Sequence, residues 1–201
     1  MQKEDNITRE ILTAIGESSD VTQRHLARRL GVALGLANTY LKRCVRKGLI
    51  KIRHAPANRY IYYLTPKGFA EKSRLTGQYL SYSFELYRKA SNSYEELFIR
   101  FAPSKRNKVV LCGLSELAEI ATLRAQEFGI TIVAIYQPEC TKTEFLKLPV
   151  IKVLDHTLSY DACVLTALND TDEMYKSILE QVGEKKILVP SMLDFVLSKK
   201  N

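Results

Sequence analysis

The sequence predicts an α+β winged helix-turn-helix domain followed by an α/β Rossmann-like parallel-sheet domain, joined by a long helix. Residues 21–70 contain eleven Lys or Arg and no carboxylate, yet they have the apolar periodicity of folded elements. Residues 75–101 contain no proline and a regular apolar stripe, which favours one long helix. From residue 108, short β-branched runs alternate with helical segments, a pattern typical of parallel sheets.

The net charge of +8 is unevenly distributed. Residues 1–106 have a balance of +11, whereas residues 107–201 have a balance of −3. This asymmetry indicates domains with different partners. We expect a DNA-binding domain at 1–74, a linker and dimerisation helix at 75–106, and a sensor or assembly domain at 107–201. A basic stretch without carboxylates favours a polyanion partner over the alternative, a solvated basic face that binds nothing.

The four cysteines and three histidines are too widely spaced for a zinc site or a disulfide framework. Reduced thiols in a cytosolic protein are the better interpretation. The polar N-terminus does not resemble a signal peptide, and the longest apolar run, 130–136, is too short to span a bilayer. We therefore expect a cytoplasmic protein that binds no metal and no membrane.

Three helices are predicted near the N-terminus. The first covers residues 6–15, and the second follows Thr22, an N-cap candidate, and runs to Leu30. Gly31 and Val32 form a tight turn before a third helix at 34–47. This order is a helix-turn-helix, in which the second helix of the pair enters the major groove of DNA.

A β-hairpin is predicted directly after these helices. Its strands are 49–53 and 59–64, and residues 54–58 provide the turn. A hairpin in this position is a wing. Thr65 and Pro66 then begin a further helix, as its N-cap and its first residue.

The outward face of the third helix carries side chains that can read bases. Asn38 could contact an adenine edge, and Thr39 a thymine methyl or a phosphate. Lys42 and Arg43 could contact guanine or phosphates, and Gly35 allows a close backbone approach. The full set of expected DNA contacts is Thr22, Gln23, Arg24, Gly35, Leu36, Asn38, Thr39, Lys42, Arg43, Arg53, His54, Asn58 and Arg59.

Several segments resemble MarR-type winged-helix regulators, most closely the subset associated with extracellular-polysaccharide gene clusters. These segments are Thr22–Ala27, Gly31–Gly35, Asn38, Gly48–Ile52 and Leu64–Gly68, within residues 5–100. The resemblance implies a bacterial transcription regulator that acts as a dimer on double-stranded DNA. Ala33 and Leu36 differ from the serine and lysine that are usual in that subset, which puts the target base sequence in question but not DNA binding.

Residues 75–101 contain an apolar stripe at alternating steps of four and three. Its members are Leu80, Phe84, Tyr87, Ser91, Tyr94, Phe98 and Phe101. Such a seam predicts pairing with the same helix of a second subunit, which would give a homodimer. The alternative is that the stripe packs on the chain's own winged helix or next domain, and the C-terminal domain is a further candidate for the dimer contact.

The second domain is predicted to contain five strands and two helices. The strands are 109–112, 130–136, 150–153, 162–167 and 186–189, and the helices are 116–128 and 171–182. A Rossmann fold binds its ligand at the carboxyl ends of such strands. The predicted ligand-binding residues are Gly113, Leu114, Ser115, Gln137, Glu139 and Thr166.

The glycine fingerprint of dinucleotide sites is degraded here. Only Gly113 remains of its three glycines, Glu116 places a negative charge beside the expected phosphate, and Gln137 replaces the ribose-binding acid. The strand order is similar to that of the N-terminal domain of PglD-like sugar O-acyltransferases and of CoA-binding-type folds. That resemblance implies a nucleotide sugar or related nucleotide as effector.

The sequence leaves several functions for the second domain open. A Rex-like redox repressor that binds NAD(H) also joins a winged helix to a Rossmann domain. The domain could instead serve oligomerisation alone, or modify a sugar nucleotide. No catalytic constellation is present in the sequence, so we expect a regulator and not an enzyme, with no cofactor beyond such an effector.

Overall fold

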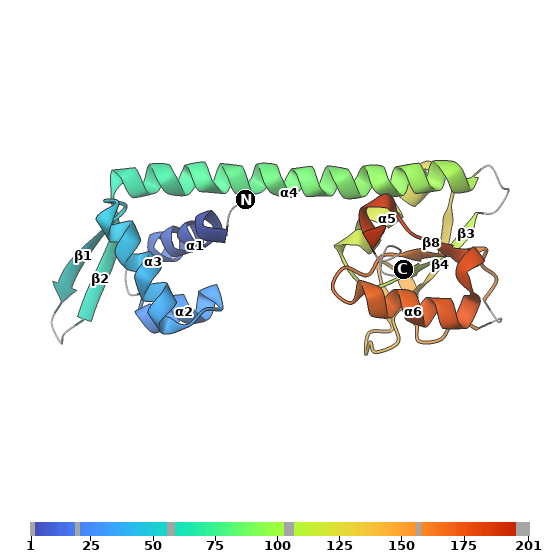
Figure 1. Ribbon diagram of the computed structural model, residues 1–201. Helices are drawn as coiled ribbons and strands as arrows, with labels where there is room; N and C mark the ends of the chain where they lie inside the picture. The colour runs from blue at the N-terminus through green and yellow to red at the C-terminus, as the bar shows by residue number, and fades with distance from the viewer. Residues whose placement is uncertain (1–2, 19–20, 56–58, 103–106, 156–157, 196–201) are drawn as a thin grey trace. The chain divides into compact units, whose positions relative to one another are not determined.

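The computed structural model describes residues 3–18, 21–55, 59–102, 107–155 and 158–195. The chain divides into two compact units, Met1–Glu85 and Leu86–Asn201. Both units contain part of one continuous helix, α4 (Pro66–Phe101), which is the long horizontal helix in Figure 1. The division between the units therefore falls within this helix. The expected bounds of 1–74, 75–106 and 107–201 stay a prediction.

The N-terminal unit is a helical cluster with a two-stranded antiparallel hairpin. Its elements before α4 are α1 (Lys3–Glu17), α2 (Gln23–Leu30), α3 (Leu34–Arg46), β1 (Ile50–Ala55) and β2 (Arg59–Leu64). The core consists of side chains from all of these helices and from the base of the hairpin, including Ile11, Leu12, Leu26, Leu41 and Ile50. The predicted helices and hairpin are thus present, with α1 extending beyond the expected stop at Gly16.

The start of α4 is anchored to the corner between α3 and β1. The Thr65 hydroxyl donates to the Gly48 carbonyl oxygen at 2.7 Å and accepts from the Gly68 amide at 3.0 Å. The Thr65 amide donates to the Leu49 carbonyl oxygen at 3.0 Å. These bonds make Thr65 the N-cap that the sequence predicts, and they hold the base of the hairpin against α4.

The C-terminal unit is built on a six-stranded, mainly parallel sheet. Its strands and helices are β3 (Lys108–Cys112), α5 (Glu116–Glu127), β4 (Thr131–Tyr136), β5 (Glu144–Phe145), β6 (Leu148–Ile151), β7 (Ala162–Leu165), α6 (Thr171–Val182) and β8 (Ile187–Leu188). The strand order is β5-β6-β4-β3-β7-β8, and only β5 runs antiparallel to its neighbour. Helix α5 packs against β4, and α6 packs against β7 and β8.

This sheet differs from the sequence-based expectation in its strand bounds and in one additional strand. β7 ends at Leu165 and not at residue 167, and β8 covers 187–188 in place of 186–189. The third parallel strand, β6, is Leu148–Ile151 and so begins and ends two residues before the predicted 150–153. The edge strand β5 was not predicted. It forms a hairpin with β6, so the connection from β4 to β6 contains no helix among the described residues.

The apolar stripe of α4 changes its environment along the helix. Tyr94 and Phe98 are fully buried in the C-terminal unit, where the Tyr94 hydroxyl donates to the Leu165 carbonyl oxygen at 2.9 Å. Leu80 and Phe84, in contrast, are 48% and 59% exposed. The last part of the predicted seam therefore packs on the chain's own sheet, which is the alternative interpretation, and only the first part is left for another partner.

Candidate nucleic-acid interface

The helix-turn-helix is fixed by local capping interactions. The Thr22 hydroxyl accepts from the His25 amide at 3.1 Å and so caps the start of α2. Gly31 ends α2 with φ of 61°, a left-handed conformation that glycine adopts without strain. The chain then turns directly into α3. A hydroxyl cap and one left-handed glycine thus fix where α2 begins and ends.

Helix α3 has a buried face and an outward face. Ala37, Leu41 and Cys44 are buried in the core of the unit. The outward face lies at i, i+4, i+7 and i+11 along the helix, and it comprises Gly35, Thr39, Lys42 and Arg46, all exposed or partly exposed. Arg46 lies on this face although we did not predict it as a DNA contact.

A groove separates α3 from the hairpin. It has a volume of about 700 Å³ and is lined by Gln23, Asn38, Thr39, Leu41, Lys42, Val45, Arg46, Ile52, Tyr60 and Tyr62. Two of these residues join α2 to the hairpin, because the Gln23 side-chain amide donates to the Tyr62 hydroxyl at 3.2 Å. The Asn38 side-chain oxygen is buried and has no hydrogen-bond partner among the described residues. A hollow of about 380 Å³ nearby is lined by Thr22, Arg24 and Leu34, among others.

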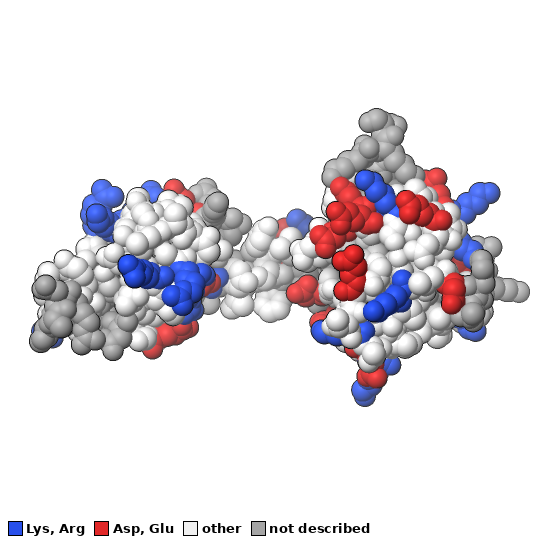
Figure 2. All heavy atoms as spheres, turned by 90° about the horizontal axis from the view of Figure 1, so that it is seen from below, with Lys and Arg blue, Asp and Glu red and all other residues white. Residues whose placement is uncertain are grey.

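The cations around this groove differ in their pairing. Within the part of the chain that the structure describes, Lys42, Arg46 and Arg53 have no ion-pair partner. Arg43 instead donates to Glu4 of α1 at 2.8 Å. Figure 2 shows one face of the N-terminal unit, on which Lys and Arg side chains gather. The unpaired cations are the ones that can neutralise phosphates without first breaking an ion pair.

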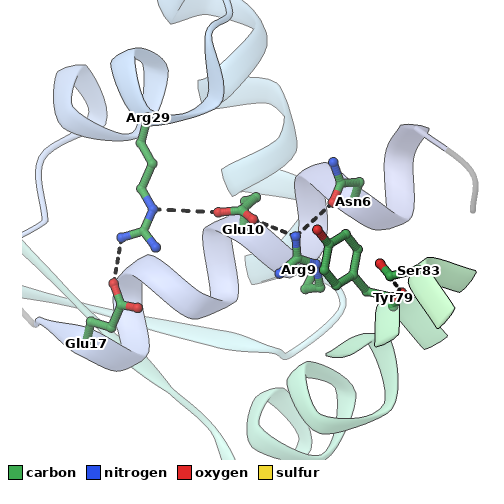
Figure 3. Close-up of polar contacts among 7 residues, drawn as sticks. All are labelled: Asn6, Arg9, Glu10, Glu17, Arg29, Tyr79 and Ser83. Carbon is green, nitrogen blue, oxygen red and sulfur yellow. Dashed lines mark hydrogen bonds and ion pairs between the residues drawn. The ribbon is translucent and has the colours of Figure 1, made fainter. Parts of the chain in front are cut away.

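A polar network joins α1 to α2 and α4 (Figure 3). Arg29 of α2 contacts Glu17 at 2.6 Å and Glu10 at 3.6 Å. Glu10 also accepts from Arg9, whose guanidinium lies 4.1 Å from the ring centroid of Tyr79 in α4. The hydrogen bond from Arg29 holds the pKa of the Glu17 carboxyl below its usual range. Arg29 is therefore part of the scaffold of this unit and not a free cation.

The structure places the predicted DNA contacts as follows. Gly35, Leu36, Asn38, Thr39, Lys42 and Arg43 are all on α3, while Thr22, Gln23 and Arg24 are at the start of α2. Arg53 and His54 are on β1, where the His54 ring lies 4.6 Å from that of Tyr60. Asn58 and the side chain of Arg59 lie outside the described residues. The role of these residues in DNA binding remains a prediction.

Sequence reasoning missed Arg46 and the hairpin residues Ile52, Tyr60 and Tyr62. Arg46 follows Thr39 by seven residues and Lys42 by four, so helical spacing alone could have placed it on the outward face. The hairpin residues alternate on one face, because Ile52 pairs with Tyr62 in the register of β1 and β2. Strand alternation could have indicated which side of the wing faces α3.

A second hollow lies at the carboxyl ends of β3, β4 and β7. It has a volume of about 290 Å³ and is lined by Gly113, Leu114, Ser115, Gln137, Glu139, Cys140, Lys142, Ala167, Leu168, Asn169, Asp170 and Met174. Five of the six predicted ligand-binding residues are in this set. Thr166 is not, because it is fully buried and donates its hydroxyl to the Gly113 carbonyl oxygen at 2.8 Å.

Protein groups already occupy several donors at this crevice. Gln137 accepts the Leu114 amide at 3.1 Å, and the Ser115 hydroxyl donates to the Thr166 carbonyl oxygen at 2.5 Å. A Cβ at Gly113 would lie 2.4 Å from the Ala167 backbone. This glycine therefore allows the close approach of β3 to the segment after β7, rather than leaving room for a pyrophosphate.

Neither a metal centre nor a membrane span is found in the described regions. No group of three or more His, Cys, Asp or Glu residues there could hold a metal ion. No described helix has both the length and the apolar character needed to cross a bilayer.

Comparison with known proteins agrees with the geometry of the N-terminal unit. Residues 4–51 match the winged helix-turn-helix DNA-binding family. No curated protein matches the chain. Solved structures similar to it include MepR of Staphylococcus aureus in complex with DNA, at 22% identity over 43% of this chain and 62% of that one, with a TM-score of 0.37.

Two further structures are similar to the same extent. One is MosR of M. tuberculosis, with 23% identity over 41% of this chain and 58% of that one and a TM-score of 0.34. The other is the zinc-dependent MarR family regulator AdcR, with 22% identity over 43% of this chain and 60% of that one and a TM-score of 0.35. The match spans about three fifths of the length of each of these proteins. With its own helices, turn and hairpin, and with the family match to residues 4–51, the N-terminal unit is a winged helix-turn-helix domain.

Proposed function

We propose that this protein is a transcription regulator that binds double-stranded DNA through α3 and the hairpin. The observation that carries this proposal is the outward face of α3, where Lys42 and Arg46 line a groove beside the hairpin. Both residues belong to the stretch 21–70, which contains no carboxylate. The recognition helix enters the major groove, and the wing follows the neighbouring backbone. Arg53 lies on β1, a strand of the wing, and is therefore expected near the DNA backbone.

Binding of the purified protein to DNA tests this proposal. We would measure fluorescence anisotropy with the DNA upstream of its own gene and with random duplex, at 50 and 200 mM salt (about a fourfold range over which phosphate contacts weaken strongly). A preference for the upstream DNA that persists at high salt is expected. Equal and salt-labile binding to both duplexes would reduce the basic face to a general polyanion site.

Homodimerisation is part of the same proposal. Leu80, Phe84 and Tyr87 are 48%, 59% and 42% exposed and follow one another at helical spacing on α4. An exposed apolar stripe on a helix favours burial against another helix. A dimer would also place two recognition helices on two half-sites of DNA.

Phe84→Glu is expected to separate the subunits. A charge in the middle of the stripe would be desolvated in a helix pair but solvated in a monomer. Analytical ultracentrifugation would report at least a tenfold weaker dimer, on the order of 1.4 kcal/mol or more. Tyr82→Glu, which replaces an aromatic side chain that is 43% exposed on the opposite side of α4, is the matched control. A Phe84→Glu protein that remains fully dimeric would exclude this part of α4 as the interface.

The C-terminal unit is proposed to be a Rossmann-like sensor or assembly domain. Its parallel strands, taken in chain order, occupy the sheet as 3-2-1-4-5, which is the order of doubly wound folds. The crevice lies where that order reverses, between β3 and β7. Ligands of such folds bind at this position.

A nucleotide sugar, and control of polysaccharide or cell-surface sugar genes, follow from the resemblances drawn from the sequence. The contacts at the crevice give less support to a phosphate-bearing ligand, because Gln137 already occupies the Leu114 amide and Glu116 begins α5. The same contacts weigh against NAD(H). A thermal-shift comparison of nucleotide sugars, NADH and phosphate-free sugars would separate these ligands from a purely structural role.

Glu4 is expected to limit DNA affinity by holding Arg43. Glu4→Gln would free Arg43 for a further phosphate, which adds about 0.9 to the log–log salt slope and raises the affinity about fivefold at 0.15 M salt. Fluorescence anisotropy over a salt series measures both quantities. Glu127→Gln makes the same charge change at the 2.8 Å Arg124–Glu127 pair in the C-terminal unit and should leave the slope unchanged. Equal effects of both variants would indicate net charge alone.

A further inference from the structure

The outward face at the start of α3 presents apolar groups rather than side-chain donors. Leu36, in the first turn, is 44% exposed. Gly35 has no side chain, and a Cβ there would meet nothing within 4 Å. Thr39, one turn later, donates its hydroxyl hydrogen to the Gly35 carbonyl oxygen at 2.9 Å. The side chain therefore has its methyl group and an acceptor oxygen, but no hydrogen-bond donor, left for a partner.

These residues form a ridge in a basic surrounding. Leu36 precedes Thr39 by three residues and Arg43 by seven, so the three lie along one side of the outward face. Asn38 and Lys42 lie on the other side and line the groove beside the hairpin together with Thr39, whereas Leu36 and Arg43 do not line it. Residues 21–70 contribute no carboxylate to this surface, and Glu4 of α1 is neutralised by its 2.8 Å contact with Arg43. Lys42 and Arg46 then leave a positive charge beside the ridge, which is complementary to a polyanion.

We propose that Leu36, together with the methyl group of Thr39, recognises the C5-methyl groups of thymine in the major groove. This inference rests on the proposed DNA-binding function and adds the base that this part of the helix selects. The residues at the start of a recognition helix are the ones that contact base edges. The thymine methyl is the apolar group that base pairs present in the major groove, so it is the contact that an exposed leucine can make there.

Hydrogen bonds to bases are then expected from other side chains of α3. Because Leu36 and Thr39 offer no side-chain donor to a base, hydrogen-bonded reading is left to Asn38 and Lys42 on the hairpin side. A preferred site would then contain thymine at one or two positions next to the base pairs that these two residues read. The preference at those positions would depend on a methyl group and not on a hydrogen bond.

Replacing thymine by deoxyuridine tests this directly, because it removes only the methyl group. A duplex selected from a random pool by the full-length protein would be resynthesised with each thymine replaced in turn. Removal of one buried methyl group is expected to weaken binding about fourfold at one or two positions. Leu36→Ala should bind the thymine and deoxyuridine duplexes equally at those positions. Leu34→Ala, equally exposed in the same turn, should keep the fourfold difference.

The outcomes separate this inference from the proposed function. If a duplex is selected but no deoxyuridine replacement changes its affinity, the protein reads DNA without thymine methyls and the inference is wrong. The same holds if Leu36→Ala retains the full difference. If no sequence is selected at all, both the inference and sequence-specific regulation fail. Leu36 is exposed, so circular dichroism of Leu36→Ala should match the unchanged protein.

Discussion

Gly68→Ala is expected to unfold the N-terminal unit or to destabilise it by about 4 kcal/mol, the range of severe core disruptions. A Cβ at this position would lie 2.0 Å from the Leu49 carbonyl oxygen, a backbone atom at the corner between α3 and β1. Leu49 cannot move away freely, because its carbonyl oxygen accepts from the Thr65 amide and its side chain is buried. The methyl group would separate α4 from the base of the wing.

The same helix provides the matched control. Gly77 also lies in α4, but a Cβ there would meet nothing within 4 Å. Gly77→Ala should therefore stabilise the unit by about 0.5–1 kcal/mol through the higher helix propensity of alanine. Hydrogen exchange of the Ile11 and Leu12 amides measures the stability of the N-terminal unit separately from that of the C-terminal unit, because both residues are fully buried in α1.

Opposite signs for these two substitutions would establish that Gly68 acts through a steric contact and not through helix propensity. If Gly68→Ala retained the exchange protection of the unchanged protein, the close packing of α4 on the α3–β1 corner would be contradicted. DNA binding should follow stability in this pair. Gly77→Ala should bind as tightly as the unchanged protein, because residue 77 lies far along α4 from the outward face of α3.

The helix-turn-helix was predictable because its signals are local. Thr22, Gly31 and Thr65 each fix a helix end through one hydrogen bond or one left-handed residue, and the structure has all three ends where the sequence predicts them. Strands β3 and β4 were also predicted, because buried parallel strands are continuous apolar runs. Features of this kind need no knowledge of the rest of the chain.

The missed features depend on partners distant in sequence or on unusual turn chemistry. The turn between β5 and β6 uses Leu146 and Lys147 at φ of 53° and 62°, positions at which Asn or Gly would normally signal a hairpin. The stripe on α4 has one spacing throughout, yet Phe98 packs on the chain's own sheet and Phe84 is exposed. Periodicity identifies an apolar face but does not identify what covers it.

The charges of the candidate interface illustrate the same limit of local reasoning. The sequence shows that Arg29, Arg43 and Arg46 are cations on a segment without carboxylates. It does not show that carboxylates of α1, earlier in the chain, hold the first two. Only the packing of α1 against α2 and α3 distinguishes Arg46, which has no ion-pair partner among the described residues.

That distinction leads to the largest expected effect on DNA binding. The double substitution of Lys42 and Arg46 by alanine removes two cations from the outward face of α3. Removing one phosphate-binding cation should lower the affinity about fivefold at 0.15 M salt, so the pair should weaken binding about 25-fold and reduce the salt slope by about 1.8. Arg43→Ala should cost less, because Arg43 must first leave Glu4 to contact DNA.

Lys152→Ala with Lys185→Ala removes the same charge from exposed positions of the C-terminal unit and is the matched control. Anisotropy titrations from about 50 to about 300 mM salt would give both the affinity and the slope. The Debye length over this range is on the order of 10 Å, so charges farther from the DNA than that are largely screened. An equal reduction of affinity in the control would mean that long-range attraction by net charge dominates. A Lys42 and Arg46 variant with unchanged slope would show that DNA does not lie against α3. If only the Lys42 and Arg46 variant has a reduced slope, its cations contact phosphates directly, because net charge alone cannot make two equally charged variants differ.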